Sequence, residues 1–373
     1  MLLVGALTSG LTTQAHPQRS SIDAERIRHD QWHIPYLKVT EAHQSSQGDG
    51  VVVAILDTGV SPHPDLRSNL LPGADLTTER PSTGQKDNSG HGTGMAGIVA
   101  AHGQSAGAGA LGVAPRAKIL PVRCFDGQLA SEVDRLASAI EYAITAGADV
   151  ISISAGGGSN PKLMRSLEAA QAAGVIVVAA AGDRPQDFTI PYPAAADGVI
   201  AVGGVDRKGE ITSTSTHGRA VDLVAPAVDI YSTSINEKYR KGTGTSNATA
   251  IVAGAAALIR AKYPYLPADE VAHRLTATAI DKGPPGRDDQ YGYGVIDLVA
   301  ALTADVPPRG FGPGGSATPS PGTTRAAGPE ADEDSAAVRG MVTLAVLIAA
   351  GAGGVWWARR RRRSDDPPPR VSR

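Results

Sequence analysis

Three polar residues of the 373-residue chain stand in glycine-rich segments and together could activate an alcohol as a nucleophile. Asp57 is in Asp-Thr-Gly-Val, His91 begins His-Gly-Thr-Gly-Met-Ala-Gly, and Ser246 is in Gly-Thr-Ser-Asn-Ala. A serine hydroxyl is a poor nucleophile at neutral pH unless an imidazole takes its proton and a carboxylate orients the imidazole. One Asp, one His and one Ser supply those parts, so the sequence predicts nucleophilic catalysis by Ser246.

Each of these residues taken alone has a simpler interpretation. Asp57 suits a turn at a strand end, His91 suits a helix cap or the surface, and Ser246 suits a helix N-cap. Asp-Thr-Gly is also the signature of aspartic proteases, but that chemistry needs a second Asp-Thr/Ser-Gly on the chain or in a dimer. The chain has no second copy, and that interpretation leaves His91 and Ser246 without a role.

Apolar runs that alternate with helical patterns predict the elements that position these residues. Three runs have the continuous apolar character of strands buried on both faces: residues 51–56, 150–154 and 175–181. Helices are predicted over residues 131–146 and from the Asn160-Pro161 cap to Gly174. The repeated β-α-β order predicts an α/β fold with a mostly parallel sheet and helices on both faces. Functional groups of such sheets collect at the carboxyl ends of the strands.

The charge balance and the single cysteine exclude other classes of protein. The chain has 35 Lys and Arg against 37 Asp and Glu, and seven of the arginines lie in the last fifteen residues. The rest of the chain is therefore net acidic, which argues against a nucleic-acid partner. Cys124 is the only cysteine, which rules out an internal disulfide and a Cys-rich metal cluster, and we expect it to be a small buried apolar residue. No loop has calcium-ligand spacing, so neither a metal nor a cofactor is predicted.

The order Asp, His, Ser and the sequence around each residue resemble the subtilisin-like serine proteases, or subtilases. The resemblance covers residues 48–302 and includes Asp57-Thr-Gly-Val-Ser-Pro-His-Pro-Asp-Leu, Gly90-His91-Gly-Thr-Gly-Met-Ala-Gly and Gly244-Thr-Ser246-Asn-Ala-Thr-Ala. It implies a subtilisin-like fold in which Asp57 orients His91, His91 is general base and then general acid, and Ser246 forms the acyl-enzyme. It also implies that the backbone N–H of Ser246 is an oxyanion donor. The residues implied to line the substrate cleft are Ser154, Ala155 and Gly156, with Ala180, Ala181 and Gly182.

Two positions depart from the pattern of that family. Asp183 stands where the family usually has Asn, whose side-chain amide donates to the oxyanion. An ionised carboxylate has no proton to give, and losing such a donor costs about 10²–10³ in turnover. A protonated Asp183 could donate, but His91 must be neutral at the same pH, so we expect a slow protease with a narrow or acid-displaced pH optimum. The alternative is that Asp183 is a surface turn residue. Ala250 replaces a usual Pro, for which we expect a small loss of stability.

The termini predict a membrane-anchored protein. Residues 341–358 have no charge, are about 27 Å long as a helix, and are followed by five arginines. By the positive-inside rule the arginines stay cytoplasmic and the catalytic domain lies outside the cell. The predicted layout is a partial signal segment (1–15), an N-terminal extension (16–47), a catalytic domain (48–304), a Pro/Gly/Ser-rich linker (305–339), a transmembrane helix (340–358) and a basic cytoplasmic tail (359–373).

This layout, together with Gln31-Trp32 and Gln47-Gly-Asp-Gly, resembles the mycosins, which are membrane-anchored subtilases attached to type VII secretion systems. The resemblance implies a polypeptide substrate and a type VII secretion complex as partner. Three interpretations of function stay open. The chain is a serine endopeptidase that cleaves exported proteins, a structural component that stabilises the secretion complex with little or no proteolysis, or a pseudoenzyme that binds peptides.

Overall fold

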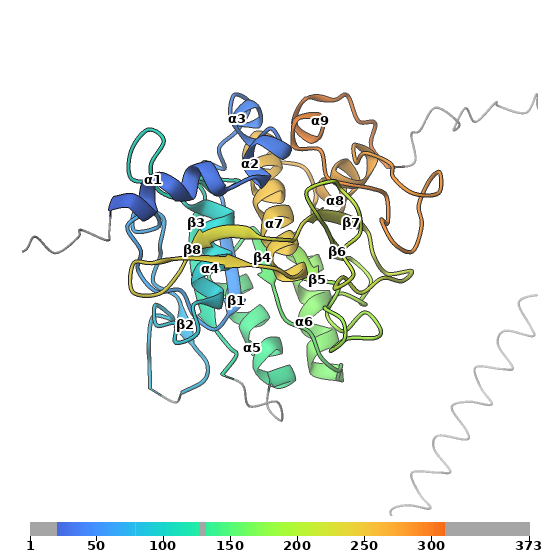
Figure 1. Cartoon of the computed structure of the whole chain (residues 1–373). Helices are drawn as coiled ribbons and strands as arrows, with labels where there is room; N and C mark the ends of the chain where they lie inside the picture. The colour runs from blue at the N-terminus through green and yellow to red at the C-terminus, as the bar shows by residue number, and fades with distance from the viewer. Residues whose placement is uncertain (1–20, 79, 127–131, 310–373) are drawn as a thin grey trace, which may run out of the picture. The chain divides into compact units, whose positions relative to one another are not determined.

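Seven parallel strands form the central sheet of the computed structural model, which describes residues 21–78, 80–126 and 132–309 (Figure 1). Their order is β2-β3-β1-β4-β5-β6-β7. The strands are β1 (Val52–Asp57), β2 (Ala74–Asp75), β3 (Lys118–Arg123), β4 (Val150–Ile153), β5 (Ile176–Ala180), β6 (Val199–Val205) and β7 (Leu223–Pro226). The predicted α/β fold with a mostly parallel sheet is confirmed, and the three predicted strands correspond to β1, β4 and β5.

Helices cover both faces of the sheet because alternate side chains of each buried strand point to opposite faces. Val53 and Ile55 of β1 join one apolar core, and Ala54 and Leu56 join the other. The first core includes residues of α4 (His91–Ala100), α7 (Thr245–Lys262), α8 (Ala268–Ala277) and α9 (Leu298–Thr303). The second includes residues of α5 (Glu132–Thr145) and α6 (Pro161–Ala172), the two predicted helices, and Asn160 caps α6 as expected.

The strand order places a crevice where the direction of chain winding reverses. The chain passes from β1 through α4 to β3 on one side, and then through α5 to β4 on the other side of β1. Because crossover connections between parallel strands are right-handed, opposite directions put α4 and α5 on opposite faces of the sheet. Ligands of such sheets bind outside the carboxyl ends of the strands at this reversal, here between β1 and β4.

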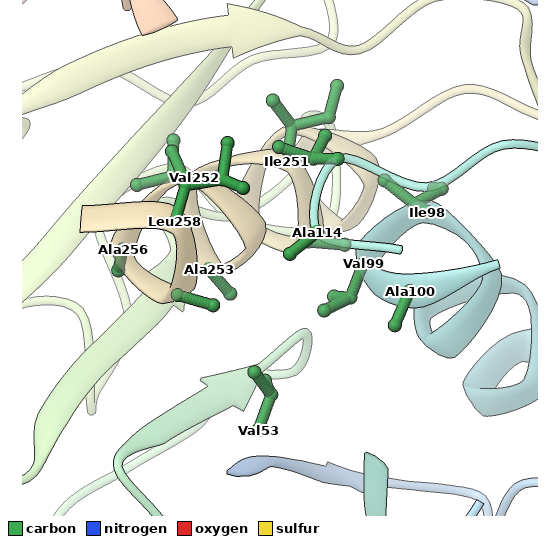
Figure 2. Close-up of a cluster of buried hydrophobic side chains, with 14 of the residues drawn as sticks. Val53, Ile98, Val99, Ala100, Ala114, Ile251, Val252, Ala253, Ala256 and Leu258 are labelled. Carbon is green, nitrogen blue, oxygen red and sulfur yellow. The ribbon is translucent and has the colours of Figure 1, made fainter. Parts of the chain in front are cut away.

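Helix α7 is held in the interior by small side chains. Figure 2 shows Ile251 of α7 beside Ala114 and on the side of the helix that faces Ile98 of α4, within one buried apolar cluster. Further along α7, a Cβ atom on Gly254 would lie only 2.7 Å from Cβ of Val113. We call the residues of α4 and α7 that belong to the first core the seam between the two helices. Close packing along this seam fixes the position of both helices. Ala250, where the family resemblance leads us to expect Pro, is the sixth residue of α7 and is fully buried.

The N-terminal helices α1 (Ser21–Asp30), α2 (His33–Tyr36) and α3 (Val39–Ala42) are tied to an antiparallel hairpin of β8 (Ile230–Thr233) and β9 (Tyr239–Gly242). The fully buried Gln31 donates from Nε2 to the carbonyls of Leu111 and Tyr231, and its Oε1 accepts from the N–H of Leu111 at 2.8 Å. Nε1 of Trp32 donates to the carbonyl of Val228 at 2.9 Å. The predicted N-terminal extension thus contacts the loop and hairpin that precede α7.

Several predicted segments lie outside the described residues. These are the signal segment 1–15, most of the linker 305–339, the transmembrane helix 340–358 and the tail 359–373. Among the helices of the described ranges, none combines the length and apolar character needed to cross a bilayer. Cys124 is fully buried with a free thiol, as predicted.

Candidate active site

Asp57 and His91 form a direct carboxylate–imidazole pair. Asp57 is the last residue of β1 and is 2% exposed, and His91 is the first residue of α4 with a side chain that is 32% exposed. Nδ1 of His91 lies 2.8 Å from Oδ1 and 2.9 Å from Oδ2 of Asp57. The charge of Asp57 raises the pKa of His91, although burial opposes that shift. Since Nδ1 donates to Asp57, the neutral ring keeps Nε2 free to accept a proton.

Gly92 permits this pair to form. A Cβ atom at Gly92 would lie 2.2 Å from the carbonyl oxygen of Gly59 and 3.0 Å from Cβ of Asp57. The helix that begins with His91 can approach the end of β1 this closely only because residue 92 has no side chain.

Asp87 fixes the start of α4 and was missed by the sequence analysis. Its buried carboxylate accepts hydrogen bonds from the N–H groups of Ser89 and Gly90 and from both the N–H and the hydroxyl of Thr93. Burial acts to raise the pKa of Asp87, but these hydrogen bonds outweigh burial and lower it. The ionised carboxylate accepts hydrogen bonds from N–H groups at the start of α4 that have no partner within the helix. Its negative charge is also stabilised by the positive end of the helix dipole. An Asp shortly before a helix start is the sequence signal that could have identified it.

Ser246 lies in the first turn of α7, beside the ends of β4 and β5. It is the second residue of the helix and follows Gly244, whose φ of 151° favours glycine. Its hydroxyl donates to the carbonyl oxygen of Ser154 at 3.1 Å, and the Ser154 hydroxyl donates to the carbonyl oxygen of Ser246 at 3.3 Å. Ser154 directly follows β4, so this pair places Ser246 at the same edge of the sheet as Asp57.

The structure differs from expectation in the direction of the Ser246 hydroxyl. The proposed chemistry needs a hydrogen bond from this hydroxyl to Nε2 of His91, and none exists between these two described residues. The hydroxyl instead donates its hydrogen bond to the carbonyl oxygen of Ser154, which directly follows β4. The helices that carry His91 and Ser246 pack against each other (Figure 2), so both residues lie at the carboxyl edge of the sheet.

Asp183 is in the expected position next to Ser246. It follows β5 after Ala181 and Gly182, and Oδ1 accepts a hydrogen bond from the N–H of Thr245 at 2.9 Å. A Cβ atom on Gly244 would lie 2.9 Å from the other carboxylate oxygen, Oδ2. Burial raises the pKa of Asp183, and the nearby charge of Asp187 adds to this shift, while Thr245 and His91 oppose it. Asp183 is therefore a half-buried carboxyl in contact with the turn that carries Ser246.

The remaining predicted residues border the same edge. Ser154 is buried, Ala155 is partly exposed and Gly156 is exposed, and a Cβ atom on Gly156 would lie 2.4 Å from Cγ of Pro191. Ala180 ends β5, and Ala181 and Gly182 are buried behind Asp183. A backbone segment can approach this edge because these side chains are small or absent.

One cavity of the described residues adjoins this site, and a larger one lies elsewhere in the molecule. The smaller, of about 430 Å³, is lined by Asp183, Asp187, Thr243 and Gly244 among others. The larger, of about 850 Å³, lies at the amino ends of β5 and β6 beside α8, away from Ser246. Within the described residues no group of three or more His, Cys, Asp or Glu side chains is arranged to hold a metal ion.

Comparison with known proteins agrees with this geometry. The Subtilase family (Peptidase S8) matches residues 48–294 of the chain. Subtilisin DY of Bacillus licheniformis is 39% identical over 274 residues, which cover 72% of this chain and 97% of that protein.

Two solved structures are similar to the described fold. One is the serine protease MycP1, described as an essential component of the type VII (ESX-1) secretion system. It is 32% identical, has a TM-score of 0.68, and the match covers 77% of this chain and 90% of that one. The other is the MycP3 protease from the type VII (ESX-3) secretion system, with 31% identity, a TM-score of 0.65, and coverage of 74% and 88%.

Proposed function

The chain belongs to the subtilase family of serine peptidases, and on that premise we propose that it is a membrane-anchored serine endopeptidase of the mycosin type that cleaves exported polypeptides. The observation that carries the proposal is the 2.8 Å pair between Asp57 and His91 at the same sheet edge as Ser246. Asp57 holds the ring so that Nε2 faces away from the carboxylate, which is the orientation that a general base requires.

In the proposed reaction, His91 Nε2 takes the proton from Ser246 Oγ as Oγ forms a bond to the scissile carbonyl carbon. The imidazolium is stabilised by Asp57. The tetrahedral intermediate collapses, the C–N bond breaks, and the same proton passes from Nε2 to the leaving amine. His91 Nε2 then takes a proton from a water molecule whose oxygen attacks the acyl carbon, and it gives this proton to Ser246 Oγ as the acyl C–O bond breaks. Before the first step, the hydroxyl must leave the carbonyl of Ser154 and turn towards His91.

Asp183 attenuates this reaction in the proposal. The backbone N–H of Ser246 belongs to the first turn of α7, where N–H groups lack partners within the helix, so it is available to the oxyanion. The second donor must come from Asp183, which can donate only when its carboxyl is protonated. Its raised pKa increases the protonated fraction, but His91 must be neutral at the same time.

A second candidate function has its own support. An ionised Asp183 beside Ser246, and a Ser246 hydroxyl that is bound to Ser154, both suit a chain whose main role is structural. In that case the subtilase fold stabilises a type VII secretion membrane complex and proteolysis is minor or absent. The proposal of a secretion complex as partner rests on the mycosin relatives MycP1 and MycP3.

Covalent labelling separates the two candidates. A fluorophosphonate probe should label the full-length chain at Ser246, and the Ser246→Ala and His91→Ala variants should not be labelled, because the probe reacts only with an activated serine. The matched control is Ser159→Ala, an exposed serine in a neighbouring loop, which should be labelled like the parent. Absence of labelling in the parent would favour the structural role. Labelling without cleavage of any peptide would favour the peptide-binding pseudoenzyme.

The membrane anchor is tested on the full chain. Residues 340–358, followed by the five arginines, support a single span with the catalytic domain outside the cell. The full chain should stay in the membrane pellet after extraction at alkaline pH, and a chain that ends at residue 339 should be released. Externally added protease should digest residues 21–309 in intact spheroplasts while a C-terminal epitope stays protected.

A further inference from the structure

Arg240 lies at the edge of the proposed active site, and its guanidinium has no hydrogen bond or ion pair among the residues that the structure describes. It lies in β9 and its side chain is partly exposed. Nη1 of the guanidinium is buried and has no hydrogen-bond partner, and no carboxylate of the described residues forms an ion pair with Arg240. By contrast, the adjacent Lys241 pairs with Asp229 at 3.1 Å. A buried guanidinium donor without an acceptor is unfavourable, so an acceptor from outside the chain would stabilise Arg240.

Two glycines create the space that the Arg240 side chain occupies. A Cβ atom on Gly94 of α4 would lie 2.8 Å from Cδ and 2.9 Å from Nη1 of Arg240. A Cβ atom on Gly242 would lie 2.8 Å from Nη2 of Arg240 and 3.5 Å from Nδ2 of Asn247, the residue after Ser246. The guanidinium therefore lies between the helix that begins with His91 and the residue that follows Ser246.

The charged groups around Arg240 already have other partners. Asp57 and Asp87 are near enough to raise the pKa of Arg240, although burial, the larger effect, lowers it. The Asp57 carboxylate is bound to His91, and the Asp87 carboxylate is bound to the first turn of α4. Neither is hydrogen-bonded to Arg240. On the other flank of Ser246, the acidic group is Asp183, which contacts Gly244 and Thr245. The site thus has an acidic flank and a cationic flank.

We propose that Arg240 is a specificity-determining residue that binds a carboxylate of the substrate on the leaving-group side, so that peptides with Glu or Asp directly after the scissile bond are preferred. This inference rests on the proposed endopeptidase function. The leaving amine takes its proton from His91, so the leaving segment must pass on the His91 side of Ser246, where Arg240 lies. The acyl segment takes the opposite side, along Ser154, Ala155 and Gly156.

The chemistry of the two groups supports this choice of ligand. The planar guanidinium presents parallel N–H donors that match the two oxygens of a carboxylate. A charge-assisted hydrogen bond of this kind favours the charged ligand over its amide isostere by about ten- to a hundredfold. A Lys at the same substrate position would be repelled.

The test compares peptides that differ at one residue. Sites cut by the full-length chain in a mixed peptide library are first mapped by mass spectrometry. Three versions of one cleaved peptide, with Glu, Gln or Lys directly after the scissile bond, then compete in one tube, so that product ratios report relative kcat/KM. The measurement is made on the parent and on Asp183→Asn. The variant is included because its expected higher kcat keeps the product ratios measurable when the parent is slow. Glu should exceed Gln by about ten- to a hundredfold, and Gln should exceed Lys.

Variants at residues 240 and 241 identify the cause of the preference. Arg240→Gln should bring the Glu to Gln ratio close to one, Arg240→Lys should keep part of the preference, and Lys241→Gln, the neighbouring cation, should leave the ratio unchanged. A parent ratio of one, or a full preference that persists in Arg240→Gln, overturns the proposal and leaves Arg240 as a counter-charge to Asp57 and Asp87. If Arg240→Gln does not fold, the parent and Arg240→Lys ratios decide.

Failure of the proposed function is recognised separately. A chain that fluorophosphonate does not label, or whose peptide cleavage survives Ser246→Ala, is not the proposed endopeptidase, and the Arg240 proposal falls with it. A chain that is labelled and cleaves the library without any preference for a carboxylate refutes only the role of Arg240.

Discussion

Oδ1 of Asp183 accepts a hydrogen bond of 2.9 Å from the backbone N–H of Thr245, the residue immediately before Ser246. The contact brings a carboxyl whose pKa is raised, chiefly by burial, to the turn that carries the proposed nucleophile. An Asn side chain in the same position would keep Oδ1 as the acceptor for Thr245 and would place an N–H donor where Asp183 has Oδ2. This relationship makes residue 183 the sharpest test of the proposed chemistry.

Asp183→Asn should increase peptide turnover at pH 7.5 by about 10²-fold or more, because it supplies a permanent second oxyanion donor and removes a negative charge. The measurement is kcat for one peptide with the parent and the variant. Asp187→Asn is the matched control, because it removes the neighbouring carboxylate without adding an oxyanion donor, and it should change kcat far less. Equal turnover of parent and Asp183→Asn at neutral pH would remove Asp183 from the proposed mechanism.

The pH dependence of the parent should be a bell of low amplitude. Neutral His91 becomes more abundant as pH rises through its pKa, which Asp57 raises, and protonated Asp183 becomes less abundant as pH rises through its own pKa, which burial raises. The optimum lies midway between the two pKa values.

Profiles of kcat/KM against pH check this bell. In Asp183→Asn the descending limb should disappear, so that activity rises through the pKa of His91 and then stays level. A parent profile that rises to a plateau above pH 7 would show that protonation of Asp183 is not required.

His33 should make stability fall in acid. Its side chain is fully buried in α2, neither ring nitrogen has a hydrogen-bond partner, and burial lowers its pKa to about 3. Below pH 6.5 the unfolded chain binds a proton that the folded chain excludes, so the stability present above 6.5 is lost as pH falls towards 3, by about 1.4 kcal/mol per pH unit. Urea unfolding measures the free energy of unfolding at pH 7 and at pH 5. Its decrease between the two pH values should be about 2 kcal/mol smaller in His33→Leu than in the parent. His29→Leu, at an exposed side chain of α1, should keep the parental fall, and the same fall in His33→Leu would contradict the assignment.

Gln31 should be a strong anchor of the N-terminal helices. Gln31→Ala removes three partly buried hydrogen bonds and leaves the N–H and carbonyl of Leu111 and the carbonyl of Tyr231 without this partner. The expected loss in the free energy of unfolding is about 3 kcal/mol, as each such hydrogen bond contributes about 1 kcal/mol. Gln44→Ala, at an exposed position after α3, is the control and should change stability little. If Gln31→Ala lowered the free energy of unfolding no more than Gln44→Ala does, Gln31 would not be the residue that anchors helices α1 to α3.

Much of the fold and the positions of the proposed catalytic groups were predictable from the sequence because they are local. Strands β1, β4 and β5 are continuous apolar runs, and the polar residue or turn after each lies by necessity at the same edge of a parallel sheet. Glycine-rich segments around Asp57, His91 and Ser246 marked the same edge. The departure at Asp183 was also visible, because it follows an apolar strand.

Long-range packing explains what the sequence did not reveal. The β8–β9 hairpin has no apolar alternation, so neither its existence nor the location of Arg240 against α4 could be read from its residues. Asp87 precedes its helix by a loop whose shape depends on Thr58 and Thr93. The direction of the Ser246 hydroxyl depends on which acceptor is nearest, Ser154 or His91, and no sequence pattern encodes a side-chain torsion.

The buried seam between α4 and α7 has a consequence for how such an enzyme can diversify. Gly254 packs against Val113, a loop residue whose N–H donates to the carbonyl of Ile98 in α4, so this contact ties the helix that presents Ser246 to α4. Positions 183 and 240 border the reacting groups yet belong to neither apolar core. Substitutions at positions 183 and 240 can therefore change the rate and the substrate preference while the packing of the two apolar cores stays the same.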